Sequence, residues 1–135
     1  MKLFLDTNVA IDLMARREPF FAEAKEIFEL AAEGDVELLM TTLSFANIFY
    51  LLRKGAGNDK AKRDLSALRA LVSIVTMNDR QLDQALSSAG MDFEDDLQGA
   101  AAESANADII ITRDEKGFKR SRVRVMTPKA FLRTL

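Results

Sequence analysis

The stretch Ala107-Asp108-Ile109-Ile110-Ile111-Thr112-Arg113-Asp114 decides the fold class, because three consecutive isoleucines are followed at once by polar residues. Successive side chains of a strand point to opposite faces of its sheet, so this unbroken apolar run predicts a strand that is buried on both faces. Such strands are typical of parallel sheets that carry helices on either side. We therefore predict a central strand over Ala107–Thr112 that ends at a polar edge.

Working outward, the sequence alternates between short apolar segments and longer segments with helical periodicity. The other predicted strands are Lys2–Leu5, Val36–Thr42, Val72–Met77 and Val123–Met126. The predicted helices run from Asn8 to Arg17, then over Phe20–Ala32, Ser44–Lys54 (with Ser44 as N-cap), Asp59–Leu71, Asp79–Ser88, Asp92–Ala105 and Pro128–Leu135. This alternation predicts one α/β domain over residues 1–135, with a central parallel sheet of about five strands and helices on both faces. Two helices separate the third and fourth strands, so Asp79–Ser88 must either cross the sheet edge or double back.

The absence of His and Cys limits the chemistry that the chain can perform. It excludes a histidine base, a thiol nucleophile, a disulfide and nearly every zinc site. A hydrolase of this composition has to rely on Asp and Glu, whose oxygens suit Mg²⁺ and Mn²⁺. No apolar run is long enough to span a membrane, and the first strand leaves no room for a signal peptide. We therefore expect a cytoplasmic protein with no membrane partner.

The charge of the chain is unevenly distributed, although its net value is only −2. Six basic residues fall within twelve positions, against two acids, and such a segment is able to contact phosphates. A solvated loop is the alternative interpretation of this run. The basic residues are Arg113, Lys116, Lys119, Arg120, Arg122 and Arg124.

Several polar residues are expected to meet at the carboxyl edge of the sheet, where open parallel sheets bind their ligands. Asp6 follows the first strand, and Asp114 follows the fourth. The helix over Asp92–Ala105 feeds the fourth strand, so its beginning, with Asp95, lies at the same edge. Asn47 is expected in the first turn of the helix that starts at Ser44. Four separate segments thus converge on one place.

Each of these residues also has a purely structural interpretation. Asp6 is able to cap the helix that follows it, and Asp114 is common in turns. Asp92 shares a helix face with Asp95, but acids also favour the positive end of a helix. Asn47 lies among apolar residues, where a buried amide needs a hydrogen-bond partner. The convergence of all four segments favours a functional site over these separate explanations.

Four motifs in order resemble those of the PIN domain family. They are Leu5-Asp6-Thr7-Asn8-Val9, Ser44-Phe45-Ala46-Asn47, Asp92-Phe93-Glu94-Asp95-Asp96-Leu97-Gln98 and Ile111-Thr112-Arg113-Asp114. Val125-Met126-Thr127-Pro128 and Phe131-Leu132 are similar to its closing strand and helix, so the resemblance covers essentially the whole chain. Within the family, the sequence looks closest to the bacterial branch related to the VapC toxins.

The resemblance implies a divalent-metal-dependent endoribonuclease that hydrolyses single-stranded RNA with Mg²⁺ or Mn²⁺. It also implies the toxin of a toxin–antitoxin pair, with a cognate antitoxin partner and a homodimer. We expect the dimer to form through the Phe20 and Phe21 side and the Tyr50–Leu51 side. The expected catalytic residues are Asp6, Asp95, Asp114 and Asn47; the metal ligands Asp6, Asp95, Asp114 and Asp92; and the substrate-binding residues Asn8, Thr112, Arg113, Lys116, Lys119 and Arg120.

Two departures from the family pattern reduce the negative charge of the expected site. Asn47 stands where the second acidic residue is usually Glu, and Gly117-Phe118 stands where related sequences often have Asp-Phe. Asp92 and Glu94 are the nearby acids that are able to compensate. A catalytically degenerate PIN-fold RNA-binding module is therefore the alternative function. A phosphohydrolase of the haloacid-dehalogenase type is disfavoured, because that family has Asp two residues after the first one, where this chain has Asn8.

Overall fold

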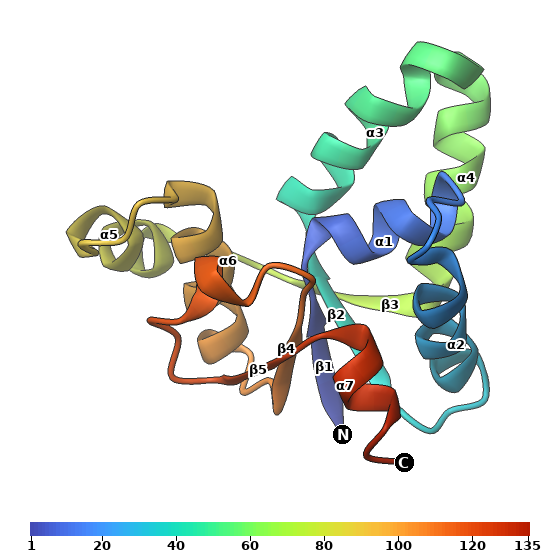
Figure 1. The fold of residues 1–135 in the computed structure, drawn as a ribbon. Helices are drawn as coiled ribbons and strands as arrows, with labels where there is room; N and C mark the ends of the chain where they lie inside the picture. Colours follow the sequence, from blue (N-terminus) through green and yellow to red (C-terminus); the bar gives the residue numbers. More distant parts are fainter.

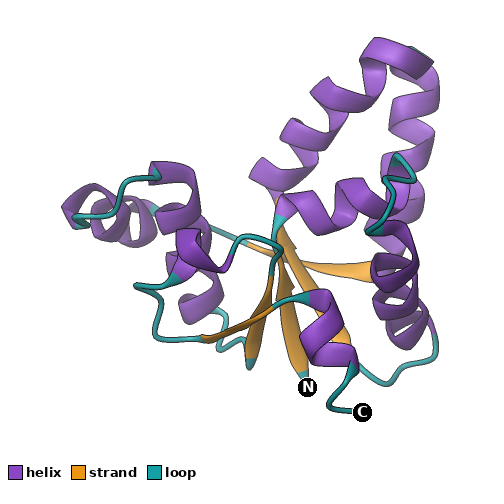
Figure 2. Ribbon diagram, in the orientation of Figure 1, coloured by secondary structure: helices purple, strands orange, loops and turns teal.

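The computed structural model describes all residues, 1–135, and its centre is a five-stranded sheet (Figures 1 and 2). The strands are parallel and lie in the order β3-β2-β1-β4-β5, which confirms the predicted fold class. Their bounds are β1 (Lys2–Leu5), β2 (Glu37–Thr41), β3 (Val72–Val75), β4 (Ile109–Ile111) and β5 (Arg124–Met126).

Seven α-helices and one 3₁₀ helix connect or follow these strands. No helix combines the length and the apolar character that crossing a membrane requires. The bounds are α1 (Thr7–Met14), α2 (Phe21–Ala32), α3 (Thr42–Ala56), α4 (Asn58–Leu71), α5 (Asp79–Ser87), α6 (Phe93–Ser104), η1 (Glu115–Phe118) and α7 (Pro128–Leu132).

The alternation of side chains along the central strands divides the interior into two cores. Leu3 and Leu5 of β1 belong to a large core under α1, α2, α3, α4 and α7, whereas Phe4 belongs to a smaller core under α6 and η1. Ile110 of β4 joins Phe4, and its two neighbours in the isoleucine run join the large core. Every side chain of that run is therefore buried, as the sequence predicts.

The strand order reverses between β1 and β4. The chain adds β2 and then β3 on one side of β1, and afterwards adds β4 and β5 on the other side. Such a switch point leaves a crevice at the carboxyl ends of the two central strands. The last residue of β1, Leu5, pairs with Ile111 of β4, so the residues after both strands leave the sheet side by side.

Two details differ from the expectations. Thr41, rather than Ser44, caps α3: its Oγ1 accepts a hydrogen bond from the Ser44 N–H at 3.2 Å, so the helix begins at Thr42. Asn47 consequently lies in the second turn. In addition, the chain passes from α4, on the face of the large core, to α5, which packs against α6 on the face of the smaller core (Figure 1).

Candidate active site at the carboxyl edge of the sheet

Asp6 is the buried centre of the site. Only 6% of it is exposed, and it lies directly after β1, where its N–H continues the sheet by donating to the Ile111 carbonyl at 3.0 Å. Asp6 occupies the N-cap position of α1 but makes no side-chain capping bond. Its Oδ2 instead accepts a hydrogen bond from Thr112 Oγ1 at 2.8 Å. The capping interpretation therefore does not describe this carboxylate.

Asp114 is tied to Asp6 through the same hydroxyl. The Asp114 N–H donates to Thr112 Oγ1 at 3.0 Å, so Thr112 joins the ends of β1 and β4. The Asp114 side chain itself is exposed. Gly117, one turn later in η1, faces it closely: a Cβ at Gly117 would lie 3.4 Å from Asp114 Oδ2 and 2.9 Å from the Asp95 Cγ.

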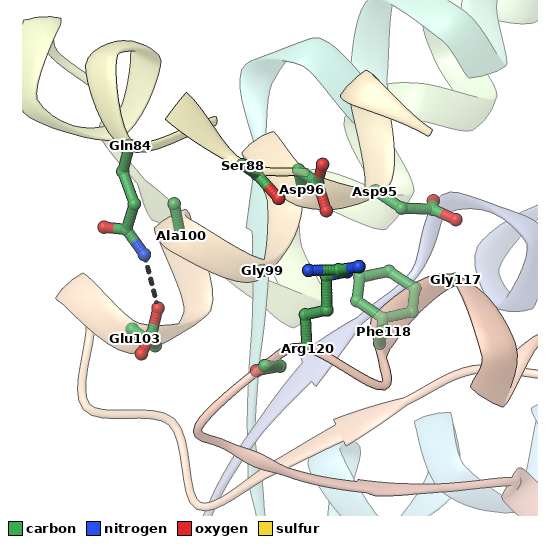
Figure 3. Close-up of a pocket in the computed structure, with 11 residues that line it drawn as sticks. Gln84, Ser88, Asp95, Asp96, Gly99, Ala100, Glu103, Gly117, Phe118 and Arg120 are labelled. Carbon is green, nitrogen blue, oxygen red and sulfur yellow. Dashed lines mark hydrogen bonds between the residues drawn. The ribbon is translucent and has the colours of Figure 1, made fainter. Parts of the chain in front are cut away.

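Asp95 approaches from the other side, in the first turn of α6. Asp92 is the N-cap of that helix, since its Oδ1 accepts from the Asp95 N–H at 3.0 Å. The structure thus gives Asp92 a structural role at the positive end of this helix, as the N-cap. Figure 3 shows that Asp95 and Asp96 diverge, with the Asp96 side chain turned into the neighbouring pocket.

Asn47 meets the site through an acid that lies beside Asp95 in the sequence. Its Nδ2 donates to Glu94 Oε1 at 2.8 Å, which joins α3 to the beginning of α6. Asn47 is half-buried rather than enclosed, so it is not a purely internal amide. Asn8, in the first turn of α1, is exposed at the same edge.

The electrostatics show that the acids form one charge cluster. Burial raises the pKa of Asp6, and hydrogen bonds from Thr112 and from the Thr7 backbone oppose that rise. Burial and, to a smaller extent, the charges of Asp6, Asp92, Asp114 and Glu94 together raise the pKa of Asp95 to about 7. No ion pair in the structure involves these five acids, so their mutual repulsion is not offset by a basic side chain.

This donor set fits a hard divalent cation in its chemistry. It offers carboxylate oxygens, with an amide nearby, and it carries uncompensated negative charge, which is what Mg²⁺ and Mn²⁺ require. The acidic side chains do not already surround one point: no group of three or more is close enough to hold an ion. Like-charged carboxylates repel one another, which favours this open arrangement.

A buried polar network lies beside the acids, and the sequence reasoning did not find it. Thr7 Oγ1 shares a hydrogen bond with Ser44 Oγ at 2.7 Å, and Gln98 Nε2 donates to the same Ser44 oxygen at 3.0 Å. Thr41 Oγ1 donates to Gln98 Oε1 at 3.2 Å. The network fixes α1, α3 and α6 relative to one another, and Gln98 within an otherwise apolar helix stripe was its only signal in the sequence.

Two of the expected substrate-binding residues have internal partners. Thr112 is fully buried and is bonded to Asp6. Arg113 forms a bidentate pair with the buried Asp12, at 2.6 and 3.2 Å, and its guanidinium lies 3.9 Å from the centre of the Phe20 ring. The side chains of Thr112 and Arg113 are therefore engaged within the protein.

The other three basic residues of the expected substrate-binding set lie beside the acids. Lys116, Lys119 and Arg120 are exposed, and they line a cleft with Asp92 and Asp96. Arg120 also lines the adjacent pocket of Figure 3, where its side chain extends toward the acidic end of α6. Positive side chains thus stand immediately beside the acidic cluster.

Comparison with known proteins identifies the family of this chain. A family model described as PIN domain matches residues 2–116, which include all four motifs. This chain belongs to the PIN domain family. Among curated proteins, no sequence match is found for this PIN domain.

Solved structures share the same fold at low sequence identity. VapBC-1 from nontypeable Haemophilus influenzae superposes with a TM-score of 0.71 at 20% identity, covering 96% of this PIN domain and 99% of that chain. A toxin–antitoxin complex from Klebsiella pneumoniae has a TM-score of 0.71 at 20% identity, with coverage of 93% and 97%. The sarcin-ricin loop cleaving toxin VapC20 from Mycobacterium tuberculosis has a TM-score of 0.59 at 18% identity, with coverage of 80% and 86%.

Proposed function

We propose that this PIN domain is a divalent-metal-dependent endoribonuclease that hydrolyses single-stranded RNA. The observation that carries the proposal is the meeting of Asp6, Asp95 and Asp114 at the switch point of the sheet. Three carboxylates from three elements share one electrostatic environment there. No purely structural role requires that arrangement, because unpaired charge close to a core is costly.

The acids have separate tasks in this mechanism. Asp6, Asp95 and Asp114 would hold Mg²⁺ or Mn²⁺, with Asp92 and Asn47 at the margin of the site. The bound ions would lower the pKa of a water molecule and offset the charge of the phosphodiester and its leaving oxygen. Thr112 holds the Asp6 carboxylate by a hydrogen bond to one oxygen, and the Asp92 cap fixes the beginning of the helix that carries Asp95. The reaction requires no histidine, in agreement with the composition.

RNA would bind along the neighbouring basic cleft. Lys116, Lys119 and Arg120 are free of the ion pairs in the structure and flank the acidic cluster, so they are positioned for phosphates next to the scissile one. Asn8 is exposed in the first turn of α1, at the same edge of the sheet. Contacts of this kind position a nucleic acid without reading its bases. An extended single strand fits this open cleft better than a stiff duplex does.

The proposal is tested by RNA cleavage together with metal binding. Purified protein should cut a single-stranded RNA in Mg²⁺ or Mn²⁺, and EDTA should stop the reaction. Asp6→Asn and Asp95→Asn should each remove most activity while the protein still folds. Asp35→Asn is the matched control, because Asp35 is an exposed acid before β2, at the opposite edge of the sheet. Equal cleavage by Asp6→Asn and the control would refute the proposal.

A catalytically degenerate RNA-binding PIN domain is the second candidate. Two observations favour it: the neutral Asn47, and the absence of a ready-made group of three acids around one point. Such a protein would retain RNA through Lys116, Lys119 and Arg120 but would bind Mn²⁺ feebly. Calorimetric Mn²⁺ titration therefore separates the two functions.

The biological role that we propose is that of a toxin with an antitoxin partner, in the cytoplasm. The VapBC-1 structure and the Klebsiella complex support it, since both contain toxin–antitoxin pairs on this fold. We also propose a homodimer. Tyr50 and Leu51, 57% and 36% exposed on α3, are better candidates for its interface than Phe20 and Phe21, which contact Arg113 and Arg16. Co-expression with the product of an adjacent reading frame and light scattering test these two points.

A further inference from the structure

The hydrogen bond between Asn47 and Glu94 is the one direct side-chain link between α3 and the acidic beginning of α6. It joins residues 47 positions apart, at 2.8 Å from Nδ2 to Oε1. Glu94 has no basic partner that would explain its position. The Asn47 side chain donates to Glu94 through Nδ2, and its Oδ1 remains available as an acceptor.

The Glu94 charge reaches the site itself. It contributes to the raised pKa of both Asp6 and Asp95, which lie on different elements. Glu94 is an exposed residue, but the hydrogen bond from Asn47 holds its carboxylate beside α3 and the beginning of α6. The Glu94 carboxylate therefore belongs to the same charge cluster as the acids that follow β1 and begin α6.

We propose that Glu94 supplies the second acidic group of the site, and that Asn47 is the residue that positions it. The inference rests on the proposed function, because it concerns the divalent ion that this site would hold. A carboxylate that comes from α3 in the general family pattern would thus come from α6 in this chain. Asn47 takes the place of that acid and holds its substitute by a hydrogen bond.

The pair also explains why position 47 is neutral. A glutamate there would place a second negative charge within hydrogen-bond distance of Glu94, and the two would repel. An amide donates to the carboxylate instead, and amide partners of this kind orient metal ligands. A variant with the carboxylate at position 47 and an amide at position 94 should therefore keep the hydrogen bond, with position 94 as the donor.

Mn²⁺ affinity, measured by calorimetry on the full chain, tests the proposal. Glu94→Gln keeps the size and an acceptor for Asn47 but removes the charge, so Mn²⁺ affinity should fall by about tenfold. Asn47→Ala keeps the charge but frees the side chain, so a smaller loss is expected. Glu26→Gln removes one equivalent charge from an exposed position of α2 and should leave affinity unchanged.

The exchange variant separates ligand loss from structural damage. Asn47→Glu combined with Glu94→Gln returns one carboxylate to the pair, so it should bind Mn²⁺ more tightly than Glu94→Gln alone. Wild-type affinity in Glu94→Gln, or no recovery in the double variant, would overturn the inference. Asp6→Asn is the reference for the proposed function. If Asp6→Asn weakens Mn²⁺ binding and Glu94→Gln does not, only the role of Glu94 fails; if the wild type binds no Mn²⁺, both fail.

Discussion

Thr112 Oγ1 donates a hydrogen bond to Asp6 Oδ2 at 2.8 Å, across 106 positions of the chain. The same oxygen accepts from the Asp114 N–H. One hydroxyl therefore fixes the buried carboxylate of β1 and the backbone of the loop after β4. The strand order reverses between β1 and β4, which makes these two strands neighbours. The hydrogen bond can therefore form only after β4 has paired with β1.

Replacing that hydroxyl by a methyl group should weaken both the fold and the site. In Thr112→Val, the buried Asp6 carboxylate loses its hydroxyl donor, and the Asp114 N–H loses its acceptor. We expect a loss of about 1–3 kcal/mol in the free energy of unfolding and a weaker affinity for Mn²⁺. Urea denaturation and calorimetry measure the two effects. Thr112→Ser retains the hydroxyl and should stay near wild type in both; an equal loss in the serine variant would contradict the role of the hydroxyl.

The raised pKa of Asp95 predicts a specific pH dependence of metal-free stability. Its pKa is about 7 in the folded chain, against an ordinary value of 3.8. Between these values the folded chain binds more protons than the unfolded chain, so this residue lowers stability as pH rises through the window, with no further change above it. Asp95→Asn does not titrate. In EDTA, its advantage over wild type in the free energy of unfolding should grow across the window and then stay constant.

Urea denaturation below, within and above this window checks the prediction. Asp35→Asn, an exposed acid at the other edge of the sheet, should show no such pH-dependent difference from wild type. A constant difference between Asp95→Asn and wild type at every pH would show that the carboxylate does not titrate as expected.

Gly117 should be required for a working site because it leaves room for Asp95. A methyl group at this position would press on the Asp95 carboxylate and lie 3.4 Å from Asp114 Oδ2. Since the flexible Asp95 side chain is able to move away, Gly117→Ala should fold but lose about tenfold in Mn²⁺ affinity. Gly55→Ala is the control, because nothing lies within 4 Å of a Cβ there. Unchanged Mn²⁺ binding in Gly117→Ala would mean that Asp95 does not need this position.

Arg113 should matter for stability and not for RNA binding. Asp12 is 1% exposed in its side chain, and Arg113 is its partner. Arg113→Gln leaves that buried carboxylate without its cation, so the free energy of unfolding should fall by about 3 kcal/mol. This value is at the lower end for a broken buried ion pair, because the Arg113 side chain is partly exposed. Adding Asp12→Asn should recover part of the loss. Lys119→Gln should show the opposite behaviour, with weaker RNA binding at unchanged stability; RNA-binding loss in Arg113→Gln at full stability would reverse this assignment.

The sequence alone predicted the fold class and the edge of the sheet at which the acids lie, because both depend on local patterns. The isoleucine run predicted a doubly buried strand, and a parallel sheet implied that Asp6 and Asp114 lie at the same edge. The adjacency of β1 and β4 was not predicted, because the local patterns do not specify strand order. The path of α5 was left open, because amphipathic periodicity does not specify which neighbour an apolar face packs against.

The remaining features depend on pairs of residues that are distant along the chain. Nothing local in Arg113 distinguishes a partner of the buried Asp12 from a phosphate ligand, and the basic residues around it favoured the second interpretation. The bond from Asn47 to Glu94 and that from Gln98 to Ser44 likewise join different helices. Such contacts follow from tertiary geometry, which spacing within one segment does not encode.

The long separation between Asp6 and Thr112 has a consequence during synthesis. A nascent chain that has not yet released β4 carries Asp6 but lacks the hydroxyl that holds it, the loop of Asp114 and the neighbouring strand. Contacts of such high sequence separation form late, after loop closure over most of the chain. An unfinished polypeptide therefore has no assembled site. If the folded protein cuts RNA, a nascent chain would be inactive beside its ribosome until Thr112 and Asp114 have emerged.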